Sequence, residues 1–87
     1  MAGPLIRLGD KISHGGSVIE ASPYSDIDGV GIARMGDKVS CSKHGMVTIA
    51  SGDMTLIVDG KLAARDGDKT SCGAVLIAGQ QTTIDKI

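Results

Sequence analysis

The sequence predicts a small all-β domain made of three similar segments arranged around a pseudo-threefold axis. Three observations support this prediction: an internal repeat, short runs of β-branched and aliphatic residues, and 13 glycines that interrupt those runs. Glycine disfavours helices, and short apolar runs bounded by Gly, Pro and Asp are typical of β-hairpins. The chain has 87 residues, so we expect one domain over residues 1–87.

The repeat is a phrase that occurs three times with the same internal spacing. Each copy reads Arg-x-Gly-Asp-Lys-x-Ser and then His or Cys, at residues 7–14, 34–41 and 65–72. A recurring phrase of this kind indicates a recurring structural unit. With the residues that lead into each phrase, we expect three internal repeats that start near Gly3, Gly31 and Lys61.

Each phrase is followed by glycine and then by two strand-like arms. The first arms are predicted at residues 18–19, 47–49 and 75–77, and the second arms at 24–27, 54–58 and 82–84. Turn-forming residues separate the two arms of each copy, so we expect these arms to form hairpins. Asp28-Gly29 and Asp59-Gly60 are then expected to turn the chain into the next copy.

The composition indicates that such a domain needs an additional source of stability. It has no Phe or Trp and a single Tyr, so its core must come from aliphatic side chains that bury less surface than large rings. Small domains also bury a small share of their surface, and many carry disulfides, a metal or a partner subunit. We therefore expect a cross-link of one of these kinds.

The charge pattern excludes several classes of partner. Nine Lys and Arg residues stand against ten Asp and Glu residues, with no basic run, so we expect no nucleic-acid partner and no stable membrane association. The sequence contains no signal peptide and no apolar stretch long enough to span a membrane. Synthesis in a reducing cytosol is expected, where two cysteines are more often thiols or metal ligands than a disulfide.

The residues favour one structural zinc ion as the cross-link. Three phrase-ending residues occupy equivalent positions, and a tetrahedral ion needs a fourth ligand. Only the second copy has an insertion after its phrase, Ser42-Lys43-His44, and this insertion ends in a histidine. A mixed set of thiolates and imidazoles favours zinc over magnesium or calcium. The predicted ligands, which are also every His and Cys in the chain, are His14, Cys41, His44 and Cys72.

Other interpretations of these residues remain open. The four could be unrelated buried and surface residues, although their spacing within the repeat argues against this. Cys41 and Cys72 could instead form a disulfide, which would leave both histidines without a role. A catalytic zinc needs an open position and a general base, whereas four protein ligands close the site and Glu20 is the only glutamate. We therefore expect no enzyme, with a small zinc-dependent hydrolase kept as an alternative.

The remaining repeat residues are expected to have structural roles. The repeat aspartates follow glycine and are expected to cap turns or to pair with the repeat arginines; they are Asp10, Asp37 and Asp68. The serines directly before the ligands could hydrogen-bond to those ligands; they are Ser13, Ser40 and Ser71. Three aliphatic residues are candidates for a partner surface, although core packing is the favoured role; they are Met46, Met54 and Ile84.

The repeat resembles the PAAR-repeat proteins, which are named for Pro-Ala-Ala-Arg. The signature survives in part as Gly60-Lys61-Leu62-Ala63-Ala64-Arg65, as Gly31-Ile32-Ala33-Arg34 and as Gly3-Pro4-Leu5-Ile6-Arg7. The resemblance covers nearly the whole chain. No copy keeps the signature intact, and two cysteines among the ligands depart from the more histidine-rich set that is usual in the family.

The resemblance implies a specific function. PAAR proteins form a β-rich cone with zinc near its apex, and they cap and sharpen the trimeric VgrG spike of type VI secretion systems, which aids membrane puncture and effector delivery. One monomer per trimer is expected, because each repeat can face one subunit. Secreted effectors are expected as further partners. The alternative from another class is a generic zinc-stabilised interaction module.

The resemblance also implies a location and an organisation. The protein is expected to be made in the bacterial cytoplasm and then exported on the spike, to the outside or into target cells, without a signal peptide. Many family members carry a toxin domain before or after the repeat. This sequence starts and stops with the repeat, so we expect a stand-alone tip with no toxin extension.

Overall fold

The computed structural model describes residues 4–79, and the fold is reported for this range. It contains nine short β-strands and no α-helix, which confirms the prediction of an all-β fold. Within residues 4–79, no helix is long and apolar enough to cross a membrane. The molecule measures 35 × 29 × 25 Å along its principal axes.

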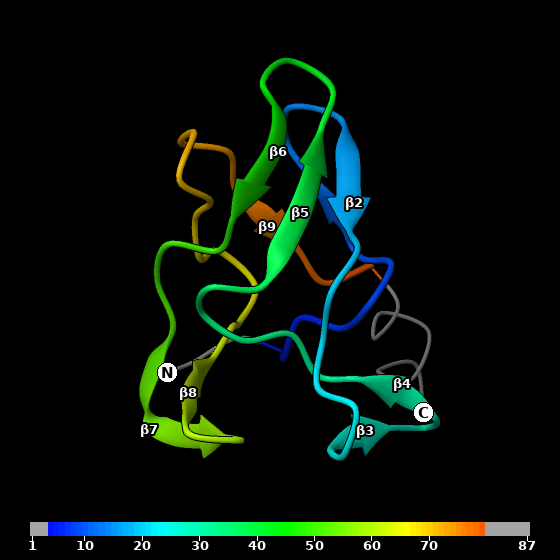
Figure 1. The fold of residues 1–87 in the computed structure, drawn as a ribbon, viewed down its shortest axis with the longest axis vertical. Helices are drawn as coiled ribbons and strands as arrows, with labels where there is room; N and C mark the ends of the chain where they lie inside the picture. The colour runs from blue at the N-terminus through cyan, green and yellow to red at the C-terminus, as the bar shows by residue number, and fades with distance from the viewer. Residues whose placement is uncertain (1–3, 80–87) are drawn as a thin grey trace.

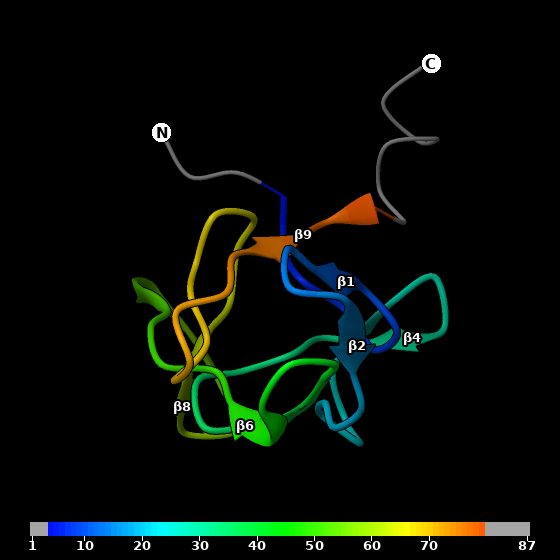
Figure 2. The same ribbon diagram turned by 90° about the horizontal axis from the view of Figure 1, so that it is seen from above.

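The largest sheet contains five antiparallel strands from all three copies. Their order is β6-β5-β2-β1-β9, with bounds β1 Lys11–Ile12, β2 Gly16–Val18, β5 Lys38–Cys41, β6 Gly45–Thr48 and β9 Leu76–Ile77. An isolated bridge between Ile49 and Thr70 joins the chain after β6 to the third copy. The predicted first arms overlap β2 and β6 in the first two copies and contain β9 in the third, and these three strands surround one axis (Figure 2).

Two small hairpins lie at the opposite end of the molecule from the turn between β5 and β6 (Figure 1). One pairs β3 (Asp26–Ile27) with β4 (Val30–Gly31), and the other pairs β7 (Asp53–Val58) with β8 (Lys61–Ala63). We call these four strands the hairpin end. Their turns have positive φ at both central residues, as type I′ turns require: 54° and 80° at Asp28-Gly29, and 53° and 79° at Asp59-Gly60. The turns predicted at these positions are confirmed.

The predicted pairing of the two arms within each copy is wrong for the first two copies. Instead, the end of each phrase forms a strand that pairs with the first arm, as β1 does with β2 and β5 with β6. The second arms, β3 and β7, pair with the residues that lead into the next copy, β4 and β8. The end of the phrase forms a strand because its apolar and polar residues alternate. In β5, Val39 and Cys41 are buried and Lys38 and Ser40 are exposed, which is the pattern of a half-buried strand.

The third copy can be followed only in part. Its first arm contains β9, as predicted, and β9 pairs with β1 of the first copy. Its predicted second arm, residues 82–84, lies outside the described residues.

A closed ring of three backbone hydrogen bonds gives the fold its pseudo-threefold symmetry. The Ile6 N–H donates to the Ala64 carbonyl (2.9 Å), the Ala64 N–H to the Ala33 carbonyl (3.0 Å), and the Ala33 N–H to the Ile6 carbonyl (2.8 Å). All three residues are fully buried and occupy the position directly before the repeat arginine. The ring places the three phrases in equivalent positions, so the residues that end them converge.

The core is aliphatic, as the composition predicts. Each copy contributes inward side chains from equivalent positions in the large sheet or beside it. The fully or almost fully buried members are Ile12 and Val18 from the first copy, Val39 and Ile49 from the second, and Leu76 from the third. This symmetric packing positions the turns that carry the four predicted ligands.

Candidate metal centre

The four residues that the sequence selects lie together where the turns of the three copies meet. His14 follows β1, Cys41 ends β5, His44 lies in the turn before β6, and Cys72 lies in the turn before β9. Their ligand atoms all lie within 4.8 Å of one another. The structure thus brings one residue from each phrase and the inserted histidine into one cluster, which we call the metal end.

The distances between these atoms fit a single tetrahedral ion. The Cys41 and Cys72 Sγ atoms are 3.7 Å apart, and His14 Nδ1 lies 3.9 Å and 3.7 Å from them. His44 Nδ1 lies 3.6 Å from Cys41 Sγ. A tetrahedral zinc ion, with bonds of about 2.3 Å to sulfur and about 2.0 Å to nitrogen, separates two sulfurs by about 3.8 Å and sulfur from nitrogen by about 3.5 Å. The donor set therefore fits a metal that prefers sulfur and nitrogen.

Close approach of two strands brings the first and second copies together at this end. Gly16 in β2 has a φ of 118°, and a Cβ atom there would lie only 1.9 Å from the Ser40 carbonyl oxygen. Only glycine allows β2 to lie this close to β5. Beside it, the Ser42 N–H donates to the Gly15 carbonyl at 2.9 Å. His14 and Cys41 are therefore held next to each other by the backbone.

The four side chains differ in how accessible they are. Cys41 is buried, His14 and Cys72 are half-buried, and His44 is exposed. The two imidazole rings are tilted by 43° with centroids 5.6 Å apart, and each ring directs its Nδ1 atom towards Cys41 Sγ. The inserted histidine thus covers the cluster on its solvent side.

A threonine that sequence reasoning did not select belongs to this centre. The buried Thr70 places its Oγ1 atom 3.0 Å from Cys72 Sγ. This hydrogen bond is the main reason that the pKa of the Cys72 thiol falls to about 6, with a further contribution from the Ala74 N–H. The thiolate is the form that binds metals. One feature of the sequence could have indicated this role: Thr70 is polar, whereas the equivalent residues of the other copies, Ile12 and Val39, are aliphatic.

The serines before the ligands support the centre through the backbone. Ser13 Oγ accepts a hydrogen bond from the Val75 N–H (2.9 Å), and Ser71 Oγ accepts one from the Thr48 N–H (3.3 Å). Each of these bonds joins two different copies. Ser13 and Ser71 therefore fix neighbouring turns to one another through backbone N–H groups, whereas the prediction was that Ser13, Ser40 and Ser71 bind the ligands.

The repeat aspartates cap turns, as expected. In each copy one carboxylate oxygen accepts a hydrogen bond of 2.8 Å from the backbone N–H of the repeat arginine three residues before it. The pairs are Arg7 with Asp10, Arg34 with Asp37, and Arg65 with Asp68. The arginine side chains, in contrast, differ between copies.

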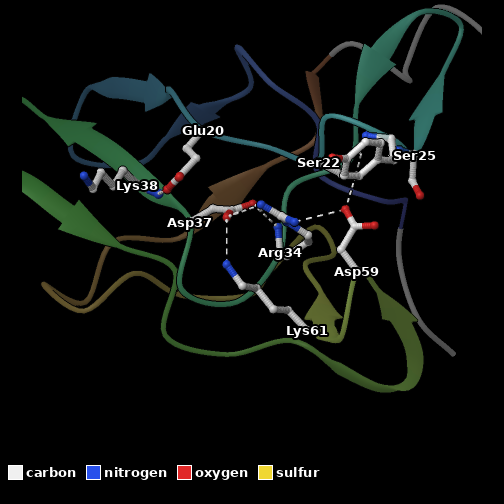
Figure 3. Close-up of polar contacts among 9 residues, drawn as sticks. Glu20, Ser22, Ser25, Arg34, Asp37, Lys38, Asp59 and Lys61 are labelled. Carbon is white, nitrogen blue, oxygen red and sulfur yellow. Dashed lines mark hydrogen bonds and ion pairs between the residues drawn. The ribbon is translucent and has the colours of Figure 1, made fainter.

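The Arg34 side chain lies between two carboxylates (Figure 3). Its Nε and Nη2 atoms donate to Asp37 at 2.9 Å and 2.8 Å, and its Nη1 atom donates to Asp59 at 3.0 Å. The hydrogen bond to Asp37 raises the pKa of Arg34. Asp59 also accepts a hydrogen bond from Ser22, and Lys61 Nζ lies 3.9 Å from Asp37. This group, which we call the Arg34 network, joins all three copies.

The other two arginines bind elsewhere. Arg7 Nη1 donates to the Ile27 carbonyl at 3.0 Å and lies 4.0 Å from Asp28. Arg65 Nε donates to Asp53 at 2.5 Å. The expected side-chain pair of a repeat arginine with its repeat aspartate is therefore seen for Arg34, whereas the ion pairs of Arg7 and Arg65 are with Asp28 and Asp53.

Comparison with known proteins identifies the family. The family model for the PAAR motif matches residues 8–78. The chain belongs to the PAAR motif family. PAAR proteins bind metals and associate with the spike of type VI secretion systems, so membership implies a spike-associated role and VgrG as a partner. The resemblance noted in the sequence is confirmed.

One relative carries the PAAR region within a far longer protein. The chain is 32% identical over 86 residues to "Double-stranded DNA deaminase toxin A" of Burkholderia cenocepacia (strain H111). The match covers 91% of this chain and 6% of that protein. The PAAR motif is a structural spike domain, and this chain spans only a small part of that relative's length.

Proposed function

We propose that this chain is a non-enzymatic tip that caps the VgrG spike trimer and is held together by one Zn²⁺ ion. The observation that carries this proposal is the ring formed by Ile6, Ala33 and Ala64, which gives a single chain three equivalent sides. A monomer with pseudo-threefold symmetry can place one copy against each subunit of a trimer. One cap per trimer follows from this geometry.

The hairpin end offers a surface for such a partner. It lies at the opposite end of the molecule from the turn that carries His44 (Figure 1). Three large apolar side chains in or beside β3 and β7 are exposed there: Tyr24 at 85%, Met54 at 82% and Ile57 at 54%. Large apolar side chains exposed at one end of a molecule are candidates for an interaction surface. The candidate Met46 lies instead on β6, and Ile84 lies outside the described residues.

The role of the metal follows from its four donors. Two sulfurs and two imidazole nitrogens fill a tetrahedral shell, which is the arrangement of structural zinc sites. The ligands would be His14, Cys41, His44 and Cys72, as the sequence predicts, and a bound ion would tie the turns of all three copies at the apex. A filled shell leaves no position for a reacting water, so the proposed role is structural.

The route by which the protein would leave the cell follows from the proposed partner, VgrG. A cap on VgrG is made in the bacterial cytoplasm and leaves the cell on the spike, outwards or into a target cell. Secreted effectors are proposed as further partners that travel with the cap. The experiment below tests the partner and the stoichiometry on which this route depends.

The test is to mix the purified chain with a VgrG trimer and to measure the mass of the complex by size-exclusion chromatography with light scattering. We expect one chain per trimer. Met54→Asp should weaken binding, because it places a charge on the proposed surface, whereas Met46→Asp should leave binding unchanged. Both side chains are exposed, so neither change disturbs the core. Three chains per trimer, or equal effects of the two variants, would contradict the proposal.

A further inference from the structure

The two cysteines of the metal end lie close enough to form a disulfide instead of binding a metal. Their Sγ atoms lie 3.7 Å apart, yet the residues are 31 positions apart in the sequence and come from different copies. Both are free thiols in the structure. A disulfide needs a sulfur–sulfur distance of about 2.05 Å, so each sulfur has to move by less than about 1 Å towards the other.

The backbone around the pair permits this movement. Cys72 lies in a turn and is followed by Gly73, which has a φ of 89°. Cys41 is followed by the inserted residues 42–44, all exposed to solvent. The Cys72 sulfur is not enclosed by packing on every side, since Cys72 is half-buried. The turns can therefore follow the sulfurs as they approach.

The pair is also arranged so that one cysteine meets an oxidant first. Cys72 is the more accessible residue, with its Sγ atom 3.0 Å from Thr70 Oγ1, whereas Cys41 is buried. Accessible thiolates react with peroxides, and a second thiol within reach then resolves the product as a disulfide. This geometry assigns the attacking role to Cys72 and the resolving role to Cys41.

We propose that Cys41 and Cys72 are a redox modification site, at which a peroxide converts the metal-bound form into a metal-free form with a Cys41–Cys72 disulfide. This inference rests on the metal site of the proposed function. Oxidation removes two of the four donors, and the two histidines alone retain the ion poorly. The disulfide still joins the second and third copies, but the His14 turn of the first copy is no longer held by the cluster.

The chemistry balances with a peroxide as the only added reactant. The Cys72 thiolate attacks one peroxide oxygen, the O–O bond breaks, and Cys72 becomes a sulfenic acid while hydroxide leaves and takes up a proton. The Cys41 sulfur then attacks the Cys72 sulfur, the S–O bond breaks, and a second hydroxide leaves as water. Two electrons pass from the two thiolates to the peroxide, and the ion leaves as Zn²⁺.

The test uses the intact zinc-loaded chain treated with hydrogen peroxide in the presence of a chromophoric zinc chelator. We expect two thiols to be lost for each zinc released, a mass lower by two hydrogen atoms, and a proteolytic fragment in which Cys41 and Cys72 are linked. Dithiothreitol with zinc should restore the original mass and metal content. Zinc content and VgrG binding of the untreated protein are measured first, so that failure of the proposed function is recognised separately.

Melting curves give an independent readout. We expect the melting temperature to be highest for the zinc-loaded protein, lower for the disulfide-linked protein and lowest for the reduced metal-free protein. The disulfide constrains the unfolded chain, but it joins only two of the three turns. Cys72→His is the control, since it replaces the sulfur donor with a nitrogen donor and so retains four metal ligands, but it cannot form the disulfide. Release of zinc with sulfinic or sulfonic products, disulfides only between chains, or retention of zinc under peroxide would each overturn the proposal.

Discussion

The metal end and the Arg34 network meet the same structural requirement in different ways. Both join residues from all three copies. At the metal end, two thiols and two imidazoles converge within 4.8 Å and need a cation to hold them. In the Arg34 network the chain provides its own cation, because the guanidinium lies between the carboxylates of Asp37 and Asp59.

The difference shows which part of the fold depends on conditions outside the chain. The stability of a site that is completed by a metal ion depends on metal supply, pH and redox state. A buried ion pair within the chain is always complete once the chain folds, although both charges have lost their water. We therefore expect the metal end to loosen before the Arg34 network does.

Metal removal is expected to have the largest effect. Zinc binding contributes about 10–16 kcal/mol in zinc-finger peptides, which equals or exceeds the whole stability of a typical domain. A chelator should therefore lower the melting temperature strongly. Hydrogen exchange should show lost protection first in the turns at residues 13–16, 41–45 and 71–74, while the amides of Ala33 and Ala64 remain protected longer. Uniform loss of protection would show that the two regions do not differ.

Breaking the Arg34 network is expected to have the next largest effect. Asp37→Asn leaves a fully buried site with one charge removed, and breaking a buried ion pair costs about 3–5 kcal/mol. Lys61→Met is the matched control, because the Lys61 side chain is about half exposed and exposed pairs contribute about 0–1 kcal/mol. Urea unfolding of zinc-loaded protein measures both. Equal losses in the two variants would mean that Asp37 acts mainly through Lys61.

Much of the metal end could be predicted from the sequence, because the repeat itself carries the information. The same spacing in each copy places His14, Cys41 and Cys72 at equivalent positions, and the insertion marks His44 as different. Symmetry then requires those three to converge, and His44 is only three residues from Cys41. Thr70 was missed because its role is a contact with one sulfur, and the sequence signals it only by a polar residue at a position that is aliphatic in the other two copies.

The strand pairing and the Arg34 network could be predicted only in part. Apolar runs indicated the arms, but the strand at Lys38–Cys41 is hidden by polar residues that alternate with Val39 and Cys41. Asp59 was assigned to a turn, which is correct, yet its carboxylate also binds Arg34 across 25 residues of sequence. A turn residue can serve two purposes, and sequence patterns report only the local one.

The His44→Ala variant tests the inserted ligand. His44 is exposed, so its removal creates no cavity in the core. It opens one coordination position, and since changes beside metal ligands already cost about 10–100-fold in affinity, we expect a loss of at least about 100-fold. Competition with a fluorescent zinc chelator measures this loss, and Lys43→Ala is the control from the same insertion. Unchanged zinc affinity in His44→Ala would exclude it as a ligand.

The smallest expected effect concerns the Asp53–Arg65 pair at the hairpin end. Hydrogen bonds, first from the Thr55 side chain and then from its backbone and from Arg65, lower the pKa of Asp53 from 3.8 to about 2. The folded state thus favours the carboxylate, and this stabilisation is present above pH 3.8 and is lost as the pH falls towards 2. The difference in urea midpoint between the natural chain and Asp53→Asn should shrink as the pH is lowered through this range. A difference in urea midpoint that does not change with pH would show that the charge of the Asp53 carboxylate does not contribute to stability.

The most direct test of the metal end is zinc X-ray absorption on protein purified without added metal, together with elemental analysis. We expect one zinc per chain, with two sulfur atoms at about 2.3 Å and two nitrogen atoms at about 2.0 Å from the zinc ion. A chain without zinc, or a zinc shell made of oxygen atoms only, would contradict the proposal that these four side chains hold the three copies together.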